Sequence, residues 1–304
     1  MAAKAEHIIL YKTQFSKQAE RLALSLEIPI GLIETRSFPD GESYVRVQPG
    51  DMKQKHILLF GSLYPPNDSI IELILVCNTL RDAGVRGISL VTPYLPYMRQ
   101  DKAFSEGEAV SANIMAELIS HHVDHLITVD PHLHRIKKLD EVFTCRTTLL
   151  HADECLGAWV RENVMNPVII GPDSESQQWV SRLAKQLGAP YLVFKKERRG
   201  DRNVQIDTRG IAEVRSFTPV IVDDIISTGT TMAKAGIAVF EQTGIQPVCL
   251  AIHGIFAVGA MNTLRNAGFS QIITTNSIPG KGVQIDLMPL LETSLGSIIH
   301  QENR

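Results

Sequence analysis

Short runs of apolar residues alternate along the first half of the chain with longer segments whose apolar positions recur at helical spacing. The apolar runs are residues 56–61, 87–92 and 125–130, and the helical segments between them are residues 70–83 and 111–121. Strands separated by helices predict an α/β fold, a mostly parallel sheet flanked by helices. Ligands of such sheets bind at the carboxyl ends of the strands, so the residues after each apolar run are the first candidates for a functional site.

The same order of elements recurs in the second half of the chain at a spacing of about 160 residues. Three matches support the repeat: Arg-Leu-Ala at residues 21–23 and 182–184, residues 80–85 and 240–245, and residues 125–130 and 271–276, the last with its spacing shortened to 146 by extra residues around 100–109. Three matches in one order indicate two related halves rather than a chance likeness of short apolar words. We therefore predict two α/β domains, residues 1–147 and residues 148–304.

Composition narrows the class of protein further. The 304 residues carry 30 Lys and Arg against 33 Asp and Glu, a formal net charge of −3. This balance excludes broad electrostatic attachment to nucleic acid or to an anionic membrane, so any anion must be bound locally. No apolar run reaches the roughly 18 residues of a membrane span, and the chain starts without a secretory signal. Four cysteines without Cys-x-x-Cys spacing favour a reduced, cytoplasmic protein.

One strand of the second half runs into an unusual turn. Residues 220–222 are followed by Asp223 and Asp224 and then by the hydroxyl-rich residues 227–231 at the start of a helix. Free backbone N–H groups and the helix dipole favour a phosphate at such a turn, whereas the two carboxylates suit the hydroxyl groups of a sugar. The alternative is an N-capping turn without a ligand. The corresponding residues of the first half, 61–68, have neither the acidic pair nor the hydroxyl-rich turn.

The segment VIVDDIISTGTT resembles the phosphoribosyl-pyrophosphate loop of the phosphoribosyltransferase fold. Phosphoribosyltransferases use one such domain, whereas ribose-phosphate pyrophosphokinases have two related domains and also bind ATP. The duplication favours the second class, as do five segments that resemble motifs of that family in the family's order: residues 38–42, 93–101, 129–132, 171–173 and 195–198. The resemblance implies two phosphoribosyltransferase-type domains that transfer the β,γ-diphosphoryl group of ATP to the 1-hydroxyl of ribose 5-phosphate, releasing AMP.

The resemblance also implies where the two substrates bind. It assigns ribose 5-phosphate to Asp223, Asp224, Ser227, Thr228, Gly229, Thr230 and Thr231. It assigns ATP to Phe38, Asp40, Gly41, Glu42, Arg99, Gln100 and Asp101, with the Phe38 ring stacked on adenine. The family builds the ATP site partly from a neighbouring subunit, which implies a homo-oligomer. On residue types alone, Arg99 and Asp101 would form a surface ion pair.

Two basic residues are expected at the tip of a hairpin-like loop. Lys196 and Arg198 lie in the segment KKERRGDR, between the apolar residues 191–194 and the alternating residues 204–206. Most exposed charged tips are merely solvated. The resemblance, however, implies that both residues are catalytic, because a basic tip can close over ATP phosphates and stabilise charge in the transition state.

Metal binding is expected at His132 and Asp173, each of which follows an apolar strand. Mg²⁺ prefers a few carboxylates together with substrate phosphate oxygens, and Asp173 with the pair Asp223 and Asp224 provides this setting. A lone histidine at a strand end is more often hydrogen-bonded than bound to a metal. The resemblance assigns Mg²⁺ contacts to both His132 and Asp173.

Two positions depart from the common pattern of the family. Many members carry an acidic residue in place of Ser227 and a second glycine in place of Thr230. These changes bear on the affinity for ribose 5-phosphate more than on the reaction. Two other functions stay open: a non-catalytic subunit that assembles with active chains, and a phosphoribosyltransferase that acts on a base. The intact basic segment and acidic pair argue against the first, and the ATP motifs of the first half argue against the second.

Overall fold

The chain divides into two compact units. The computed structural model describes residues 6–48, 50–199, 203–207, 210–280 and 283–302. The first unit comprises Met1–Leu150 and Met288–Arg304, and the second comprises His151–Leu287. Of the described helices, none is long and apolar enough to cross a membrane.

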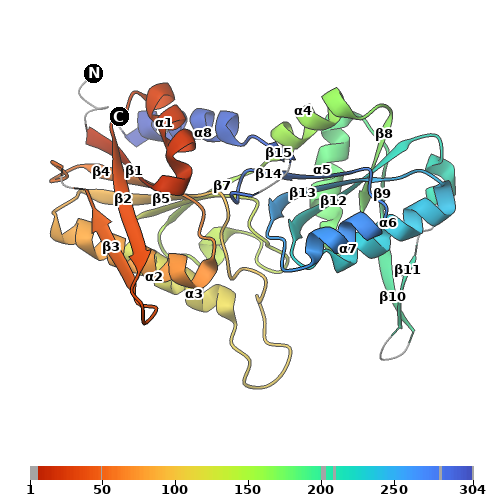
Figure 1. Ribbon diagram of the computed structural model, residues 1–304, viewed down its shortest axis with the longest axis horizontal. Helices are drawn as coiled ribbons and strands as arrows, with labels where there is room; N and C mark the ends of the chain where they lie inside the picture. Colours follow the sequence, from red (N-terminus) through yellow and green to blue (C-terminus); the bar gives the residue numbers. More distant parts are fainter. Residues whose placement is uncertain (1–5, 49, 200–202, 208–209, 281–282, 303–304) are drawn as a thin grey trace. The chain divides into compact units, whose positions relative to one another are not determined.

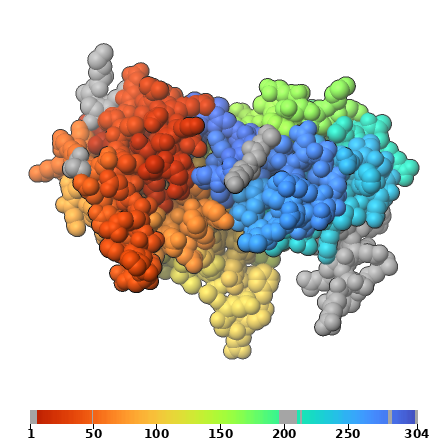
Figure 2. All heavy atoms as spheres, viewed as in Figure 1, coloured from red at the N-terminus to blue at the C-terminus, as the bar shows by residue number. Residues whose placement is uncertain are grey.

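The first unit is built on a seven-stranded sheet in the order β3-β2-β1-β4-β5-β6-β7 (Figure 1). Only β3 runs antiparallel to its neighbour, and Figure 2 shows the turn between β2 and β3, coloured orange-red, projecting from the surface of this unit. The strands are β1 (His7–Lys12), β2 (Ile30–Ser37), β3 (Ser43–Val47), β4 (His56–Phe60), β5 (Gly87–Thr92), β6 (His125–Val129) and β7 (Arg146–Leu150). The helices are α1 (Ser16–Leu26), α2 (Pro66–Asp82), α3 (Ser111–His122) and α8 (Met288–Glu302), with 3-10 turns at Thr13–Phe15 and Leu139–Glu141.

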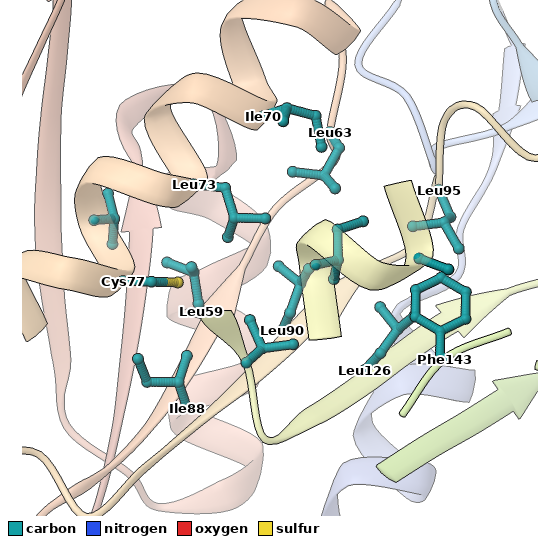
Figure 3. Packing of buried hydrophobic residues seen from close by; sticks show 14 of the residues in the cluster. Leu59, Leu63, Ile70, Leu73, Cys77, Ile88, Leu90, Leu95, Leu126 and Phe143 are labelled. Atoms are coloured by element: carbon teal, nitrogen blue, oxygen red, sulfur yellow. The ribbon is translucent and has the colours of Figure 1, made fainter. Parts of the chain in front are cut away.

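Helices α2 and α3 bury an apolar face against this sheet (Figure 3). On α2 the buried positions Ile70, Leu73, Cys77 and Leu80 recur at helical spacing, so they share one side of the helix. All residues of β5 and β6 are buried, because central parallel strands are covered on both faces of the sheet. The apolar runs of the sequence therefore become the central strands of the unit.

The second unit has a six-stranded sheet in the order β15-β14-β13-β12-β8-β9, and a separate antiparallel pair, β10 and β11. The strands are β8 (Pro167–Gly171), β9 (Tyr191–Val193), β10 (Lys195–Arg199), β11 (Asn203–Asp207), β12 (Thr218–Ile226), β13 (Val248–Gly254), β14 (Gln271–Thr275) and β15 (Val283–Ile285). The helices are α4 (Asp153–Asn163), α5 (Gln177–Leu187), α6 (Thr230–Thr243) and α7 (Ala260–Asn266), with 3-10 turns at Ser174–Ser176 and Ile211–Val214.

The two sheets repeat one topology. Without its antiparallel edge strand, the first sheet reads β2-β1-β4-β5-β6-β7, and the second reads β9-β8-β12-β13-β14-β15 in the corresponding order. All neighbours within these two series are parallel. The duplication inferred from sequence matches is thus a duplication of the fold, in which β4 corresponds to β12 and α2 to α6.

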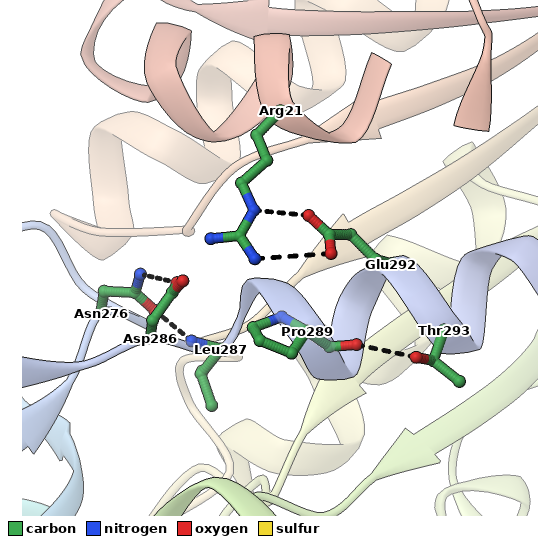
Figure 4. Close-up of polar contacts among 7 residues, drawn as sticks. All are labelled: Arg21, Asn276, Asp286, Leu287, Pro289, Glu292 and Thr293. Atoms are coloured by element: carbon green, nitrogen blue, oxygen red, sulfur yellow. Dashed lines mark hydrogen bonds and ion pairs between the residues drawn. The ribbon is translucent and has the colours of Figure 1, made fainter. Parts of the chain in front are cut away.

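The helix that follows the last strand of each sheet belongs to the other unit. Helix α4 follows β7 but contacts α5 in the second unit, and α8 follows β15 but contacts α1 in the first. Equivalent ion pairs hold both contacts. Arg21 Nε lies 2.6 Å from Glu292 Oε1 (Figure 4), and Arg182 Nε lies 2.6 Å from Asp153 Oδ2. The expected division at 147/148 therefore differs from the observed units chiefly in its last segment, because α8 buries its apolar side on the first unit.

Candidate active site

The acidic pair of the second unit lies near the end of its strand β12. Residues 220–222 are fully buried because β12 pairs with β8 on one side and β13 on the other. Asp224 is 2% exposed and Asp223 is half-buried, and the backbone N–H of Asp224 donates to Asp223 Oδ1 at 3.0 Å. The strand continues to Ile226, so both carboxylates belong to the strand itself and are held by its sheet pairing.

A third carboxylate acts on this pair. Asp173 follows the neighbouring strand β8, is 7% exposed and accepts a hydrogen bond from the backbone N–H of Glu175 at 3.0 Å. Burial raises the pKa of Asp223 well above its usual range, and the charges of Asp224 and Asp173 raise it further. The predicted grouping of these acidic strand ends is therefore present, and a divalent cation with oxygen ligands would relieve their repulsion.

The hydroxyl-rich turn leads directly into helix α6, which begins at Thr230. The side chains of Thr228 and Thr230 are exposed, and their hydroxyl oxygens lie 3.1 Å apart. The carbonyl of Ser227 accepts a hydrogen bond from the backbone N–H of Ala257 at 3.0 Å, which ties the turn to the segment after β13. Accessible hydroxyls and the N–H groups of the first helical turn can thus bind an anion there.

The backbone requires glycine at position 229 but tolerates a side chain at position 230. Gly229 has a φ of 75°, and a Cβ at this position would lie 3.0 Å from Leu264 Cγ, so glycine is required. Thr230 is the first residue of α6 and has an exposed side chain, so it carries no comparable strain. The departure from the family pattern at Thr230 is therefore accommodated without distortion of the turn.

The predicted basic hairpin is present as the antiparallel pair β10 and β11. Lys196 faces Ile206 and Arg198 faces Val204 in the strand register. Both residues therefore belong to the first strand of the hairpin, and the expectation that they lie at its tip is wrong for the backbone. The connection, residues 200–202, falls outside the described residues, as do the side chains of Lys196 and Arg198.

In the first unit, Phe38, Asp40, Gly41 and Glu42 form the turn between β2 and β3. The backbone N–H of Phe38 donates to the Glu42 carbonyl at 2.7 Å, and that of Gly41 donates to the Phe38 carbonyl at 2.9 Å. Asp40 Oδ1 accepts from the backbone N–H of Glu42 at 3.2 Å. The turn is thus closed by its own hydrogen bonds, and its ring and two acidic side chains are exposed.

The three predicted ATP ligands in the segment after β5 differ in how accessible they are. Arg99 is exposed and Gln100 is half-buried, whereas Asp101 is committed to Arg135, whose Nη1 lies 2.6 Å from Asp101 Oδ1. Burial alone would raise the pKa of Asp101, but its hydrogen bonds and ion pair with Arg135 outweigh burial and lower it. The expected surface pair of Arg99 and Asp101 is therefore wrong. Sequence reasoning missed Arg135, because no local pattern marks it as the partner of a residue so distant in the chain.

His132, a predicted metal ligand, lies in the first unit after β6. Its ring is perpendicular to that of His134, with 3.9 Å between the ring centroids, and both side chains are half-buried. Asp173 belongs to the second unit, so the two predicted ligands are placed by different units. A metal contact at His132 stays a prediction.

Fold and site together define a class: an α/β protein made of two phosphoribosyltransferase-type units, of which the second carries the acidic strand and the hydroxyl-rich turn. The structure is similar to the crystal structure of phosphoribosylpyrophosphate synthetase from Mycobacterium smegmatis, with a TM-score of 0.82 and 22% identity. The match covers 97% of this chain and 99% of that one, and shows a shared fold.

Sequence comparisons identify the family within this class. The family described as "N-terminal domain of ribose phosphate pyrophosphokinase" matches residues 7–122, and "Phosphoribosyl transferase domain" matches residues 141–278. Ribose-phosphate pyrophosphokinase of Sulfurisphaera tokodaii is 35% identical over 93% of this chain and 98% of its own length. That of Pyrococcus furiosus is 33% identical over 86% of this chain and 91% of its own length. The chain belongs to the ribose-phosphate pyrophosphokinase family, which confirms the predicted fold class and the predicted kind of enzyme.

Proposed function

We propose that this enzyme transfers the β,γ-diphosphoryl group of ATP to the 1-hydroxyl of ribose 5-phosphate, giving phosphoribosyl pyrophosphate and AMP in the cytoplasm. The observation that carries the proposal is the end of β12, where the carboxyl groups of Asp223 and Asp224 lie in the strand and a hydroxyl-rich turn follows it. A sugar phosphate needs both groups, because its hydroxyls donate hydrogen bonds and its phosphate accepts them. A base-specific phosphoribosyltransferase would have no need of the nucleotide motifs in the first half.

Ribose 5-phosphate would bind with its phosphate at the start of α6. Ser227, Thr228, Thr230 and Thr231 offer hydroxyl donors there, and Gly229 allows the backbone to turn towards the anion. The ribose hydroxyls would then reach back to the carboxylates of Asp223 and Asp224. In this arrangement the 1-hydroxyl is held at the acidic edge of the sheet.

The acidic edge fits a Mg²⁺ site. Asp173, Asp223 and Asp224 supply oxygen ligands, and the raised pKa of Asp223 reflects its burial and the negative charge gathered on these three residues. Mg²⁺, when bound, neutralises phosphate oxygens and the developing charge of the transferred group. We assign a further contact to His132, from the resemblance of its motif.

Lys196 and Arg198 would place positive charge next to the transferred diphosphoryl group, which is anionic. Phosphoryl transfer depends on alignment and charge stabilisation more than on covalent catalysis. Both residues lie in β10, two positions apart, in a hairpin outside the main sheet. A short antiparallel pair with few supports can change position with less cost than a strand of the central sheet.

ATP would bind through the first unit. Phe38 provides an exposed ring for stacking on adenine, and Asp40, Gly41 and Glu42 provide acceptors and a close backbone approach for the base and sugar. Arg99 and Gln100 are accessible for the phosphates and ribose, with Asp101 holding their segment through Arg135. We propose that the β2–β3 turn completes the site of a neighbouring copy, so that the active enzyme is a homo-oligomer.

The decisive experiment is an assay of purified protein with Mg²⁺, ATP and ribose 5-phosphate. We expect AMP and phosphoribosyl pyrophosphate in equal amounts, and no AMP when either substrate is omitted. Formation of ADP instead of AMP would show transfer of a single phosphoryl group and reject the reaction. If no AMP forms but the protein raises the activity of a catalytic relative on mixing, the non-catalytic subunit is the correct function.

A further inference from the structure

An arginine that no sequence motif marks lies against the ring of Phe38. Arg36 in β2 and Tyr44 in β3 are direct partners in the strand register, next to the turn that begins at Phe38. Arg36 Cζ lies 4.6 Å from the centroid of the Phe38 ring and 4.3 Å from that of Tyr44. The two rings are nearly perpendicular, at 88°, with 6.0 Å between their centroids. One guanidinium group thus fills the corner between two aromatic rings.

We propose that Arg36, supported by Tyr44, is a positioning residue for nucleotide binding that acts through Phe38. The inference rests on the proposed role of Phe38 as the ring on which adenine stacks. The backbone of the turn is already fixed by its hydrogen bonds, so the free variable at Phe38 is the rotation of its side chain. The guanidinium covers part of the ring and restricts that rotation, while 38% of the residue remains exposed for a planar base.

Two physical effects favour the bound nucleotide. A ring that is held in place before binding loses less rotational freedom when a base stacks on it. The guanidinium also brings a positive charge next to a site for an anionic ligand, and cation–π contact leaves that charge accessible. Tyr44 is needed because it holds the guanidinium from the second side.

The alternative is that Arg36 merely balances the charge of an acidic side chain on its hairpin. Its neighbour on the same hairpin, Arg46, does so: Arg46 Nη1 lies 3.5 Å from Glu34 Oε2, and both side chains are exposed. Within the described part of the chain, Arg36 pairs with no carboxylate, and its contacts are the two rings. The two arginines therefore offer a test variant and a matched control on one element.

The first measurement compares steady-state constants of Arg36→Leu and Arg46→Leu. We expect Arg36→Leu to raise the KM for ATP about three- to tenfold, with kcat and the KM for ribose 5-phosphate within twofold of the wild type. Tyr44→Leu should change the KM for ATP in the same direction by a smaller factor. Arg46→Leu should leave all three constants unchanged. An unchanged KM for ATP in Arg36→Leu would overturn the proposal.

A double-mutant cycle tests whether Arg36 acts through Phe38. Phe38→Leu alone should raise the KM for ATP, and adding Arg36→Leu should then raise it by a clearly smaller factor than in the wild type, because the ring that Arg36 positions is gone and only its charge still acts. A general loss of fold or charge would instead weaken binding equally in both backgrounds. Equal effects in the two backgrounds would therefore reject a positioning role.

A binding measurement tests the role of Arg36 independently of the proposed reaction. The affinity for a non-hydrolysable ATP analogue is measured by calorimetry on the wild type and the same variants. If the wild type forms no AMP while Arg36→Leu still weakens the analogue and Arg46→Leu does not, the proposed reaction fails and the positioning role stands. If the analogue binds Arg36→Leu as tightly as the wild type, the positioning role fails whatever the assay of AMP shows.

Discussion

The corresponding strands β12 and β4 of the two units carry different chemistry at their carboxyl ends. In the second unit β12 carries Asp223 and Asp224 near its end and leads into a hydroxyl-rich turn. In the first unit β4 is followed by Gly61 and Ser62, beside a pocket of about 380 Å³, its open mouth included. Leu59, Leu63 and other apolar side chains line most of that pocket. Ser62 is 1% exposed, and its hydroxyl has no hydrogen-bond partner among the described residues.

The comparison shows that the duplicated fold supplies a position for chemistry but not the chemistry itself. Both strands are central, buried and followed by a helix, so both deliver a strand end at the edge where α/β sheets bind ligands. Only the second copy adds donors and carboxylates there. The first copy places exposed ligand candidates on its β2–β3 turn instead, the feature absent from the second sheet.

The largest expected effect separates catalysis in the second unit from binding in the first. Lys196→Ala should lower kcat about 100- to 1000-fold, because an ammonium group beside the transferred phosphates stabilises charge mainly in the transition state. The thermal unfolding midpoint should stay the same, since β10 lies outside the main sheet. Lys195→Ala, one position away in the same strand, is the control and should keep nearly full activity. Similar losses in both variants would mean that the hairpin needs only its total charge.

Asp223→Asn should lower kcat/KM for ribose 5-phosphate about 10- to 100-fold, because an amide cannot become the carboxylate that accepts from the ribose hydroxyls once Mg²⁺ and the sugar displace its proton. The same change should raise the unfolding midpoint of the ligand-free protein at neutral pH. The raised pKa of Asp223 means that the folded protein keeps a proton which the unfolded chain releases. Its contribution to the unfolding free energy therefore falls as pH rises from the ordinary range of a carboxyl towards the raised pKa.

The pH dependence of the unfolding midpoint checks the origin of this effect. We expect the decline with rising pH to flatten in Asp223→Asn. Asp68→Asn alters an exposed acid in the first turn of α2, the helix of the first unit that corresponds to α6, and serves as the control. It should change neither activity nor the pH profile. An undiminished decline in Asp223→Asn would show that other groups cause it.

Gly229→Ala should raise the KM for ribose 5-phosphate and lower the unfolding free energy by about 1–3 kcal/mol. The alanine would have to adopt a backbone φ of 75°, and its Cβ would lie 3.0 Å from Leu264 Cγ. Gly244 follows the same helix with a φ of 71°, and a Cβ added there would meet no neighbouring atom within 4 Å. Gly244→Ala should therefore cost about 1 kcal/mol in chemical denaturation and leave the KM unchanged. Equal KM values for all three proteins would remove the turn from the binding site.

The smallest effect concerns the first unit. Ser62→Ala should leave activity unchanged and raise the unfolding free energy by about 1 kcal/mol, because a buried hydroxyl without a partner is removed. Thr275 in the second unit is equally buried, but its hydroxyl donates to the Ile252 carbonyl at 2.6 Å. Thr275→Val should therefore lower the unfolding free energy by a similar amount. A loss of stability in Ser62→Ala would mean that its hydroxyl is satisfied in solution.

Features set by neighbouring residues were predictable from the sequence. The apolar runs became the buried strands, and the hydroxyl-rich turn became the start of α6, because side-chain periodicity and turn residues act over short stretches of the chain. The grouping of Asp173 with Asp223 and Asp224 was also predictable, since parallel strands bring their carboxyl ends to one edge. The order of three short matches was enough to reveal the duplication.

Features set by contacts between distant residues were not predictable in this way. The pairing of Asp101 with Arg135, the ring contacts of Arg36 and the return of α8 to the first unit all join segments whose local patterns are independent. The position of Lys196 within a strand, rather than at a tip, depends on the register of β10 against β11.

The sequence by itself thus determined the elements, the duplicated α/β order and the chemistry available after β12, because each follows from side-chain periodicity and composition over a few residues. Only the tertiary structure decided which arginine binds which carboxylate or ring, and which unit receives the last helix. Those choices depend on packing and electrostatics across the fold, where many pairings satisfy the same local pattern and the assembled geometry selects one.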